Sequence, residues 1–299
     1  MARKQSHSSP SLLLVLFLAL MVLGAWIYQQ TIRVRSTAPA TAPASVQSGP
    51  DTIRVATWNL RQFGSQATTD VGMVSRIITD NRFDVMAIQE VQKDGRGVDA
   101  LLHALAGPWR STSLSPESRS GERLVFIYRG DHVQELGQPE MLPGASPGVF
   151  ERIPYCATFK AGNFDFELIT VHLTWGNAGQ RQQEVAELAR LLPRMAAGQA
   201  EKDIIVLGDF NEQHTRPNLH HFVGSGWDTV VTQGTNLSSK EIYDHILVNA
   251  TYTREYTGDT GVYRFDEMLF QNHDKEAALS VSDHRPVWAD FRTTLADDD

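Results

Sequence analysis

The segment Asp203–Glu212, DIIVLGDFNE, constrains the fold most, because it joins a buried strand to a carboxylate at the strand's end. Its apolar run IIVL is typical of a strand inside a sheet. Gly208 ends the run at Asp209, and Asn211 follows two residues later, so that both polar side chains can point to one side. Their oxygen atoms suit a hard divalent cation such as Mg²⁺ or Mn²⁺, although Gly, Asp and Asn are also ordinary turn residues.

Strands and helices alternate from residue 52 onward. Apolar runs rich in β-branched and aromatic residues predict strands at 53–59, 84–90, 124–128, 155–160, 166–172, 204–209, 242–248 and 286–291. Helical spacing of apolar residues predicts helices at 71–81, 97–106 and, most clearly, 180–195. The segments 111–121 and 137–148, rich in Gly, Ser and Pro, are expected to be loops, and 258–275 has no clear pattern. We expect a single α/β or α+β domain at 51–299.

The first fifty residues carry a different signal, an apolar run behind two basic side chains. Leu12–Ile27 contains no charged residue, is extended by Tyr28, and is preceded by Arg3 and Lys4. Its length just reaches the about 17–25 residues that span a bilayer. We expect a basic segment at 1–11, an uncleaved single-pass signal-anchor at 12–28, a Pro/Ala/Ser/Thr-rich tether at 29–50 and a domain outside the cytoplasm. Cleavage of the segment would instead give a secreted protein.

The charge of the chain argues against binding of nucleic acid by bulk electrostatics. The net charge is −8. Residues 1–50 hold four of the 27 basic side chains and no acidic one, so the remainder carries 23 basic against 35 acidic side chains, or −12. Bound metal ions would offset part of this charge. The single cysteine, Cys156, excludes an intramolecular disulfide and favours a buried thiol.

Polar residues recur where the expected strands end. The set is Asn59, Glu90, His172, Asp209, Asn211, Asp283 and His284, with Asp244 just before the apolar run 246–248. Each residue alone fits a turn or a cap. Their recurrence indicates a site, because α/β domains place their sites on loops at the ends of a rigid sheet. Carboxylates brought together would repel one another unless a cation neutralised them, so the pattern predicts a divalent-metal site.

These residues stand in motifs that resemble the endonuclease/exonuclease/phosphatase superfamily. In chain order the motifs are TWN at 57–59, IQE at 88–90, VH at 171–172, GDFN at 208–211, YDH at 243–245 and SDHRPV at 282–287. Within the superfamily the chain is similar to the deoxyribonuclease I branch. The resemblance implies a four-layer α/β (α+β) sandwich, with two mixed β-sheets packed face to face and helices on the outside. It also implies hydrolysis of phosphoester bonds with Mg²⁺ or another divalent ion.

The resemblance further implies catalytic roles. The implied metal ligands are Asn59, Glu90, Asp209, Asn211 and Asp283, of which Asp209 and Asn211 would also bind the attacking water and the phosphate. His284, oriented by Asp244, would take a proton from water. His172, oriented by Glu122, would stabilise the phosphate or protonate the leaving oxygen.

Contacts to the substrate phosphate are implied for Arg152 and Arg61. Two positions depart from the deoxyribonuclease I pattern. Gln92 stands where that branch has an arginine in the minor groove, and Ser120 where it has a tyrosine that stacks on DNA. The contacts to DNA are therefore expected to differ from those of that branch.

The sequence predicts a divalent-metal-dependent phosphodiesterase that uses Mg²⁺ or Mn²⁺, with Ca²⁺ as a candidate co-ion, and acts on DNA as a low-specificity endonuclease. The alternative is a phosphatase or phospholipase C-type hydrolase of sphingomyelin or an inositol phosphate, which an acidic, membrane-anchored protein would suit. A non-catalytic binding module is disfavoured, because a competent residue fills each catalytic position. The sequence indicates no protein partner.

Overall fold

Two mixed six-stranded β-sheets lie face to face in the computed structural model, which describes residues 51–65, 69–92, 94–213 and 217–296. The first sheet has the order β11-β12-β1-β2-β4-β3, with strands Tyr256–Val262, Val287–Arg292, Thr52–Phe63, Val85–Gln92, Glu122–Arg129 and Trp109–Ser111. The second has the order β5-β6-β7-β8-β10-β9, with strands Gln134–Met141, Tyr155–Ala161, Phe164–His172, Ile204–Asp209, Asp244–Asn249 and Trp227–Thr229. All described residues belong to one compact unit.

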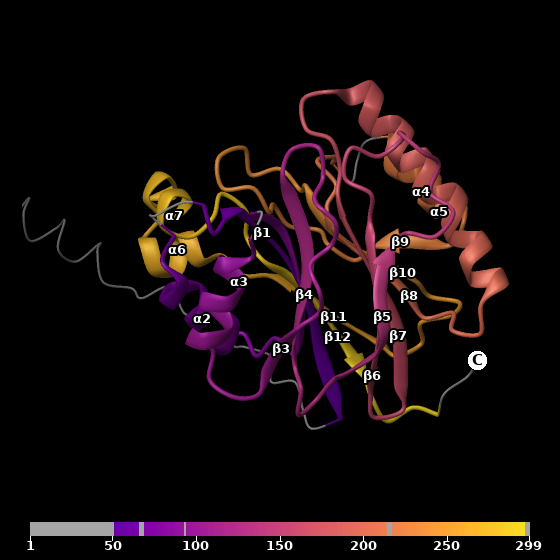
Figure 1. Cartoon of the computed structure of the whole chain (residues 1–299), viewed down its shortest axis with the longest axis horizontal. Helices are drawn as coiled ribbons and strands as arrows, with labels where there is room; N and C mark the ends of the chain where they lie inside the picture. Colours follow the sequence, from indigo (N-terminus) through magenta and orange to yellow (C-terminus); the bar gives the residue numbers. More distant parts are fainter. Residues whose placement is uncertain (1–50, 66–68, 93, 214–216, 297–299) are drawn as a thin grey trace, which may run out of the picture. The chain divides into compact units, whose positions relative to one another are not determined.

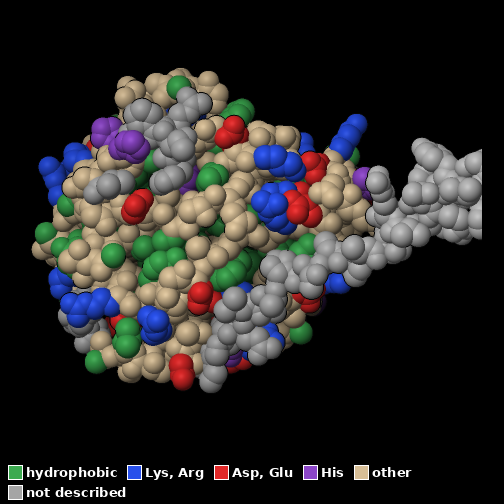
Figure 2. All heavy atoms as spheres, turned by 180° about the vertical axis from the view of Figure 1, so that it is seen from behind, with side chains coloured by type: hydrophobic (Ala, Val, Ile, Leu, Met, Phe, Trp, Pro, Cys, Tyr) green, Lys and Arg blue, Asp and Glu red, His purple; other side chains and the backbone are tan. Residues whose placement is uncertain are grey.

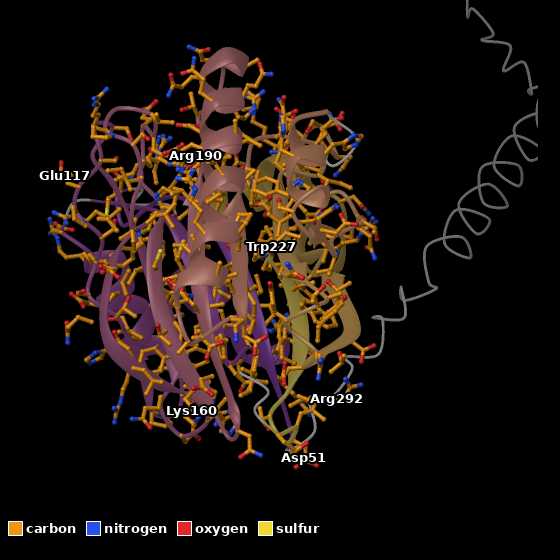
Figure 3. The ribbon with its side chains drawn as sticks, turned by 90° about the vertical axis from the view of Figure 1, so that its right-hand side faces the viewer. Asp51, Glu117, Lys160, Arg190, Trp227 and Arg292 are labelled. Atoms are coloured by element: carbon orange, nitrogen blue, oxygen red, sulfur yellow. The ribbon has the colours of Figure 1, made fainter. Side chains whose placement is uncertain are left out.

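Both sheets follow the same plan, with one parallel pair of strands at the centre and antiparallel neighbours outside. The parallel pairs are β1 with β2 in the first sheet and β7 with β8 in the second. Because the carboxyl ends of parallel strands meet at one edge of a sheet, each sheet brings two strand ends together. Figure 3 places Asp51, where β1 begins, at one end of the sandwich with Lys160, and Glu117 at the opposite end.

Helices cover the outer face of each sheet and complete a four-layer sandwich (Figure 1). On the first sheet lie α2 (Val71–Asp80), α3 (Arg96–Ala104), α6 (Phe265–Phe270) and α7 (Asp274–Ser280), and on the second lie α4 (Ala178–Gly198), α5 (His220–Val223) and the 3₁₀ turn Pro217–Leu219. Apolar clusters separate the layers: Val55, Phe126 and Leu207 lie between the sheets, and Trp58 of β1 and Leu188 of α4 lie between a sheet and its helices. The predicted fold class is confirmed.

Several predicted elements need correction. β1 continues beyond Asn59 to Phe63, and part of the expected loop 137–148 is strand β5. The apolar pattern does not predict β5, because β5 is a partly exposed edge strand. It also contains Gly137 and Pro139, which lie where its register with β6 shifts between Leu136 and Glu140. The segment 258–275, which showed no clear pattern, contains the end of β11 and helix α6.

The predicted membrane anchor at 12–28, the basic segment before it and the tether after it lie outside the described residues. Within the described ranges, no helix has both the length and the apolar character needed to cross a membrane.

Gly208 allows β8 to pass close to β7. Its φ of +140° disfavours other residues, and a Cβ atom there would overlap the carbonyl oxygen of Val171. We expect Gly208→Ala to lower the free energy of unfolding by about 3 kcal/mol or more, measured by urea denaturation. The matched control is Gly258→Ala, which shares a positive φ of +91° but has open space around its Cβ. It should cost only about 1 kcal/mol, and equal losses in the two variants would contradict the role of the close approach.

Candidate active site

The ends of the two parallel strand pairs meet over one polar hollow. Asn59 and Glu90 come from β1 and β2 in the first sheet, and His172 and Asp209 end β7 and β8 in the second. Asp209 pairs with His172 on one side and with Asp244 of β10 on the other, so cross-strand register alone makes these three residues neighbours. The hollow measures about 470 Å³, and its lining includes Glu90, His172, Asp209, Asn211, Asp283 and His284.

The backbone of the first sheet is irregular where it reaches the hollow. The register between β1 and β2 shifts between Asn59 and Phe63, and that between β2 and β4 shifts between Ile88 and Val91. Glu90 has a φ of +60° and Gln62 a φ of +49°, values that are unfavourable for residues other than glycine. Bulges and strained residues of this kind re-aim side chains next to active sites.

A buried amide joins the two sheets beneath the hollow. Nε2 of Gln89 donates hydrogen bonds to the hydroxyl of Thr57 in the first sheet and to that of Thr170 in the second, both at 2.9 Å. Gln89 is fully buried. A glutamine near the end of the otherwise apolar strand DVMAIQE is the sequence signal of this contact. The bonds of Gln89 fix the separation of the sheets next to Asn59 and Glu90.

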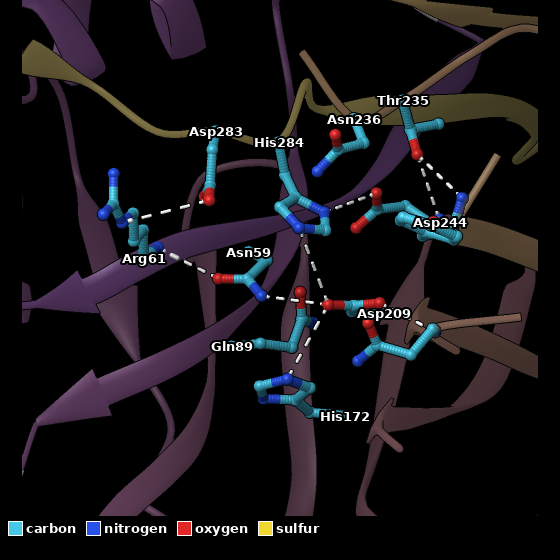
Figure 4. A network of polar contacts seen from close by, with 12 residues as sticks. Asn59, Arg61, Gln89, His172, Asp209, Thr235, Asn236, Asp244, Asp283 and His284 are labelled. Carbon is cyan, nitrogen blue, oxygen red and sulfur yellow. Dashed lines mark hydrogen bonds and ion pairs between the residues drawn. The ribbon is translucent and has the colours of Figure 1, made fainter. Parts of the chain in front are cut away.

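Asp209 is the hub of the polar network (Figure 4). Its Oδ2 accepts a hydrogen bond from Nδ2 of Asn59 at 3.0 Å, and the same amide nitrogen donates to Oε1 of Glu90 at 2.9 Å. Its Oδ1 accepts the backbone N–H of Asn211 at 2.8 Å. The oxygen of Asn59 accepts the backbone N–H of Arg61, so Asn59 bridges the two acids in this orientation. Its predicted role as an oxygen ligand stays a prediction.

His284 lies against Asp244, as the resemblance implied. Its Nδ1 is 2.8 Å from Oδ2 of Asp244, and its Nε2 is 3.9 Å from Oδ2 of Asp209. The loop that carries His284 is tied to β1 by two hydrogen bonds. The indole of Trp58 donates to the backbone carbonyl of His284, and the hydroxyl of Ser282 donates to the backbone carbonyl of Asn59. The imidazole is therefore held at Nδ1 and through its backbone, which leaves Nε2 facing the hollow.

The charges around His284 favour its protonated form. Burial opposes a charge on the ring, but the carboxylates of Asp244 and Asp209 outweigh burial and raise the pKa of His284 from 6.5 to about 10. A divalent cation next to Asp209 would cancel part of this field. It would lower the pKa of His284 toward the range in which the ring is neutral and can accept a proton.

His172 faces the same hollow from the opposite side, with Glu122 and Arg152 behind it. Its Nδ1 lies 3.4 Å from Oε2 of Glu122, near enough for an ion pair but not aligned as a hydrogen bond, and its Nε2 lies 3.7 Å from Oδ2 of Asp209. Nε of Arg152 donates to Glu122. Burial opposes a charge on Glu122, but His172 and Arg152 together lower the pKa of Glu122 to about 2, so this carboxylate stays ionised.

The donor set of the hollow fits a hard divalent cation. Ligand atoms of Asp209, Asp244 and His284 lie within 4.8 Å of one another, although Asp244 already bonds Nδ1 of His284, which suits that pair to proton transfer. Oδ1 of Asp244 is buried without a hydrogen-bond partner among the described residues. Glu90 offers a partly exposed carboxylate to the same hollow. Oxygen-rich sites of this kind take Mg²⁺ or Mn²⁺.

The remaining predicted residues lie at the rim. Arg61 and Asp283 are both more than a third exposed, with Nε of Arg61 3.9 Å from Oδ2 of Asp283 and its Nη1 donating to the carbonyl of Ala278 at 3.4 Å. Arg152 lines the hollow, and its Nη1 has no hydrogen-bond partner in the described part of the chain. Figure 2 shows basic and acidic side chains interspersed over one face of the molecule.

Two aromatic side chains in the lining, Trp175 and Tyr243, received no role from the sequence. Their signal was weak, because an aromatic residue in a loop is ordinarily a packing residue.

Comparison with known proteins places these motifs in one family. Residues 56–284 match the model of the Endonuclease/Exonuclease/phosphatase family. The chain is 30% identical over 281 residues to a deoxyribonuclease of Thioalkalivibrio sp. (strain K90mix), covering 82% of this chain and 73% of that protein. It is 24% identical to human deoxyribonuclease-1 over 277 residues, covering 82% and 94%. The structure of a mannosyl-6-phosphatase from Bacteroides thetaiotaomicron shares the fold, with a TM-score of 0.55, 17% identity and coverage of 79% and 98%.

Proposed function

The chain belongs to the endonuclease/exonuclease/phosphatase family of metal-dependent hydrolytic phosphoesterases, and we propose that its substrate is DNA, cleaved with low sequence preference. One observation supports this proposal above the others. Two histidines, each beside a carboxylate, face the same buried Asp209 from opposite sides of one hollow. That arrangement provides a proton acceptor and a proton donor on either side of a phosphate. The relatives named as deoxyribonucleases support DNA as the phosphodiester.

The chain's own residues divide the reaction between them. His284, oriented by Asp244, takes the proton of the attacking water through Nε2. His172, oriented by the ionised Glu122, donates a proton or hydrogen bond to the leaving oxygen. The guanidinium of Arg152, which lines the hollow, neutralises a non-bridging phosphate oxygen. Glu90 and Asp209, with Asp283 at the rim, would hold a Mg²⁺ or Mn²⁺ ion, which supplies Lewis-acid polarisation of the phosphoryl group.

Parallel assays test the substrate. We expect the purified full-length protein with Mg²⁺ to nick supercoiled plasmid DNA, and to release phosphocholine from sphingomyelin and phosphate from inositol phosphates only slowly. Excess EDTA should abolish the cleavage, and added Mg²⁺ or Mn²⁺ should restore it. The rival reading, a phosphatase or phospholipase C-type hydrolase, is favoured by the net charge of −8. Turnover of a lipid or inositol phosphate that exceeds DNA cleavage would replace the present proposal with that one.

We also propose that residues 12–28 anchor the protein in a membrane, with the catalytic domain on the extracytoplasmic side. The support is the uncharged apolar run Leu12–Ile27 behind Arg3 and Lys4. The mature protein should then sediment with membranes and keep its N-terminus, which cell fractionation and N-terminal sequencing measure. A soluble product that begins within residues 38–45 would show a secreted enzyme instead.

A further inference from the structure

Trp175 is the most exposed large apolar side chain in the part of the chain that the structure describes. It is 66% exposed, whereas Leu279, Leu295 and Ile153 are 47%, 38% and 37% exposed. Of these four, Trp175 alone lines the hollow that contains His172 and His284. An indole left in water forgoes the stabilisation that burial would bring, and an exposed aromatic residue at a binding cleft is typical of ligand contact.

The loop around Trp175 is held in place. The N–H and the hydroxyl of Thr174 both donate to the buried Glu184 at 2.8 Å. The carbonyl of Thr174 accepts a hydrogen bond from Nη1 of Arg181 at 3.0 Å, and Asn177, two residues after Trp175, caps helix α4. The indole itself meets the ring of Tyr243 at 5.9 Å and 68°, edge to face. The exposed face of Trp175 therefore has a fixed position beside the site.

The hollow continues in two directions with different chemistry. On one side Trp175 and Tyr243 also border a second hollow of about 230 Å³. Arg152 also borders a third hollow of about 190 Å³, which Arg119 and Arg123 line together with Glu117, Glu122 and Glu151. Arg123 pairs with Glu117 and Arg152 with Glu122, whereas Arg119 is exposed. Nε of Arg123 is buried without a hydrogen-bond partner in the described part of the chain. An aromatic surface thus borders one neighbouring hollow, and a mixed set of arginines and glutamates borders the other.

We propose that Trp175 stacks on an unpaired nucleobase next to the phosphate that is cleaved, so that the enzyme prefers single-stranded DNA. Stacking tolerates any sequence, because every base has a π-face, and the exposed Arg119 at the third hollow suits the next phosphate of a flexible strand. In a duplex, both faces of each base are already covered by its neighbours, and a base must leave the stack before it can reach Trp175. This inference rests on the proposed function, since it assumes that DNA is the substrate.

Steady-state kinetics of the full-length protein test the stacking. We compare wild type, Trp175→Ala and Trp175→Phe on a single-stranded oligonucleotide, on its duplex, and on two thymidine dinucleotide analogues, in which either the 5′ or the 3′ base is missing. Trp175→Ala should raise KM for the single strand about tenfold and change KM more than kcat, and Trp175→Phe should recover most of the loss. The effect of Trp175→Ala should shrink on one of the two base-free analogues. Leu279→Ala, on helix α7 and 47% exposed, is the matched control.

The outcomes separate this inference from the proposed function. Wild type that cleaves no DNA at all would overturn the proposed function. If wild type cleaves DNA but Trp175→Ala has the same KM as wild type on the single strand, only the stacking is overturned. Loss of hydrolysis on sphingomyelin vesicles in Trp175→Ala, with DNA cleavage unaffected, would assign the indole to a lipid surface and also overturn it.

Discussion

Replacing Glu90 with glutamine is expected to lower turnover by about a hundredfold or more while the fold remains intact. Glutamine has the size of glutamate but lacks the charge that a divalent cation requires. Both carboxylate oxygens of Glu90 already accept hydrogen bonds, from the amide of Asn59 at 2.9 Å and from the N–H of Gln62 at 2.8 Å. An amide can accept only one of these bonds, so a small local change at the bulge of β1 is expected as well.

Two measurements separate loss of the cation from loss of the fold. Mg²⁺ or Mn²⁺ should raise the thermal midpoint of wild type through binding to the native state, and this rise should be absent or much smaller in Glu90→Gln. The midpoint without added cation should stay close to that of wild type. Glu276→Gln makes the same chemical change on helix α7, where the side chain is 66% exposed, and should leave activity unchanged. A Glu90→Gln enzyme with wild-type turnover would remove Glu90 from the mechanism.

The site depends on both sheets at once. Asn59 and Glu90 come from the first sheet, and His172 and Asp209 from the second, and the hydrogen bond from Asn59 to Asp209 joins residues 150 positions apart. Gln89 makes the same connection in the buried layer below. The catalytic geometry therefore forms only when the two sheets are docked, and a change at their interface should affect activity as well as stability.

The sequence could predict those parts of the fold that depend on local patterns. Buried central strands such as β2 and β8 appear as short apolar runs, and α4 has clear helical spacing, because burial selects apolar residues with the period of the element. Strands at or next to a sheet edge were harder to detect. β3 and β9 contain three residues each, and β5 and β11 are polar and partly exposed, so their pairing partners define them more than their composition does.

The residues of the site could be named from the sequence, and one contact between them, but not the backbone geometry that aims them. Polar residues at strand ends indicated Asp209 and His284, and the motifs implied Asp244 as partner of His284. The positive φ of Glu90 and the register shifts of β1 and β2 depend on pairing between distant segments, and no local pattern reports them. Trp175 carries no signal in its own segment, since only the folded loop shows that it is exposed beside the catalytic groups.

The largest effect on the proton transfer is expected from His284→Ala, which should lower kcat by about 10²–10⁴-fold. Asp244→Asn should lower it by about 10- to 100-fold, because the imidazolium that forms as water is deprotonated loses its carboxylate partner. The pH–rate profile gives a second readout. Asp244 is among the groups that raise the pKa of His284, and activity rises with pH as His284 loses its proton. Removing the charge of Asp244 should therefore move the acidic limb of the profile to lower pH.

A double-mutant cycle distinguishes a working pair from two independent residues. If Asp244 acts through His284, adding Asp244→Asn to His284→Ala should cost little more than His284→Ala alone, because the partner that Asp244 orients is already gone. If Asp244 only begins strand β10, where its N–H donates to the hydroxyl of Thr235, Asp244→Asn should be nearly neutral for kcat in both backgrounds. Asp228→Asn on the adjacent strand β9 is the matched control. A fully active His284→Ala enzyme, or an Asp244→Asn enzyme with the wild-type rate and acidic limb, would exclude this pair as the base.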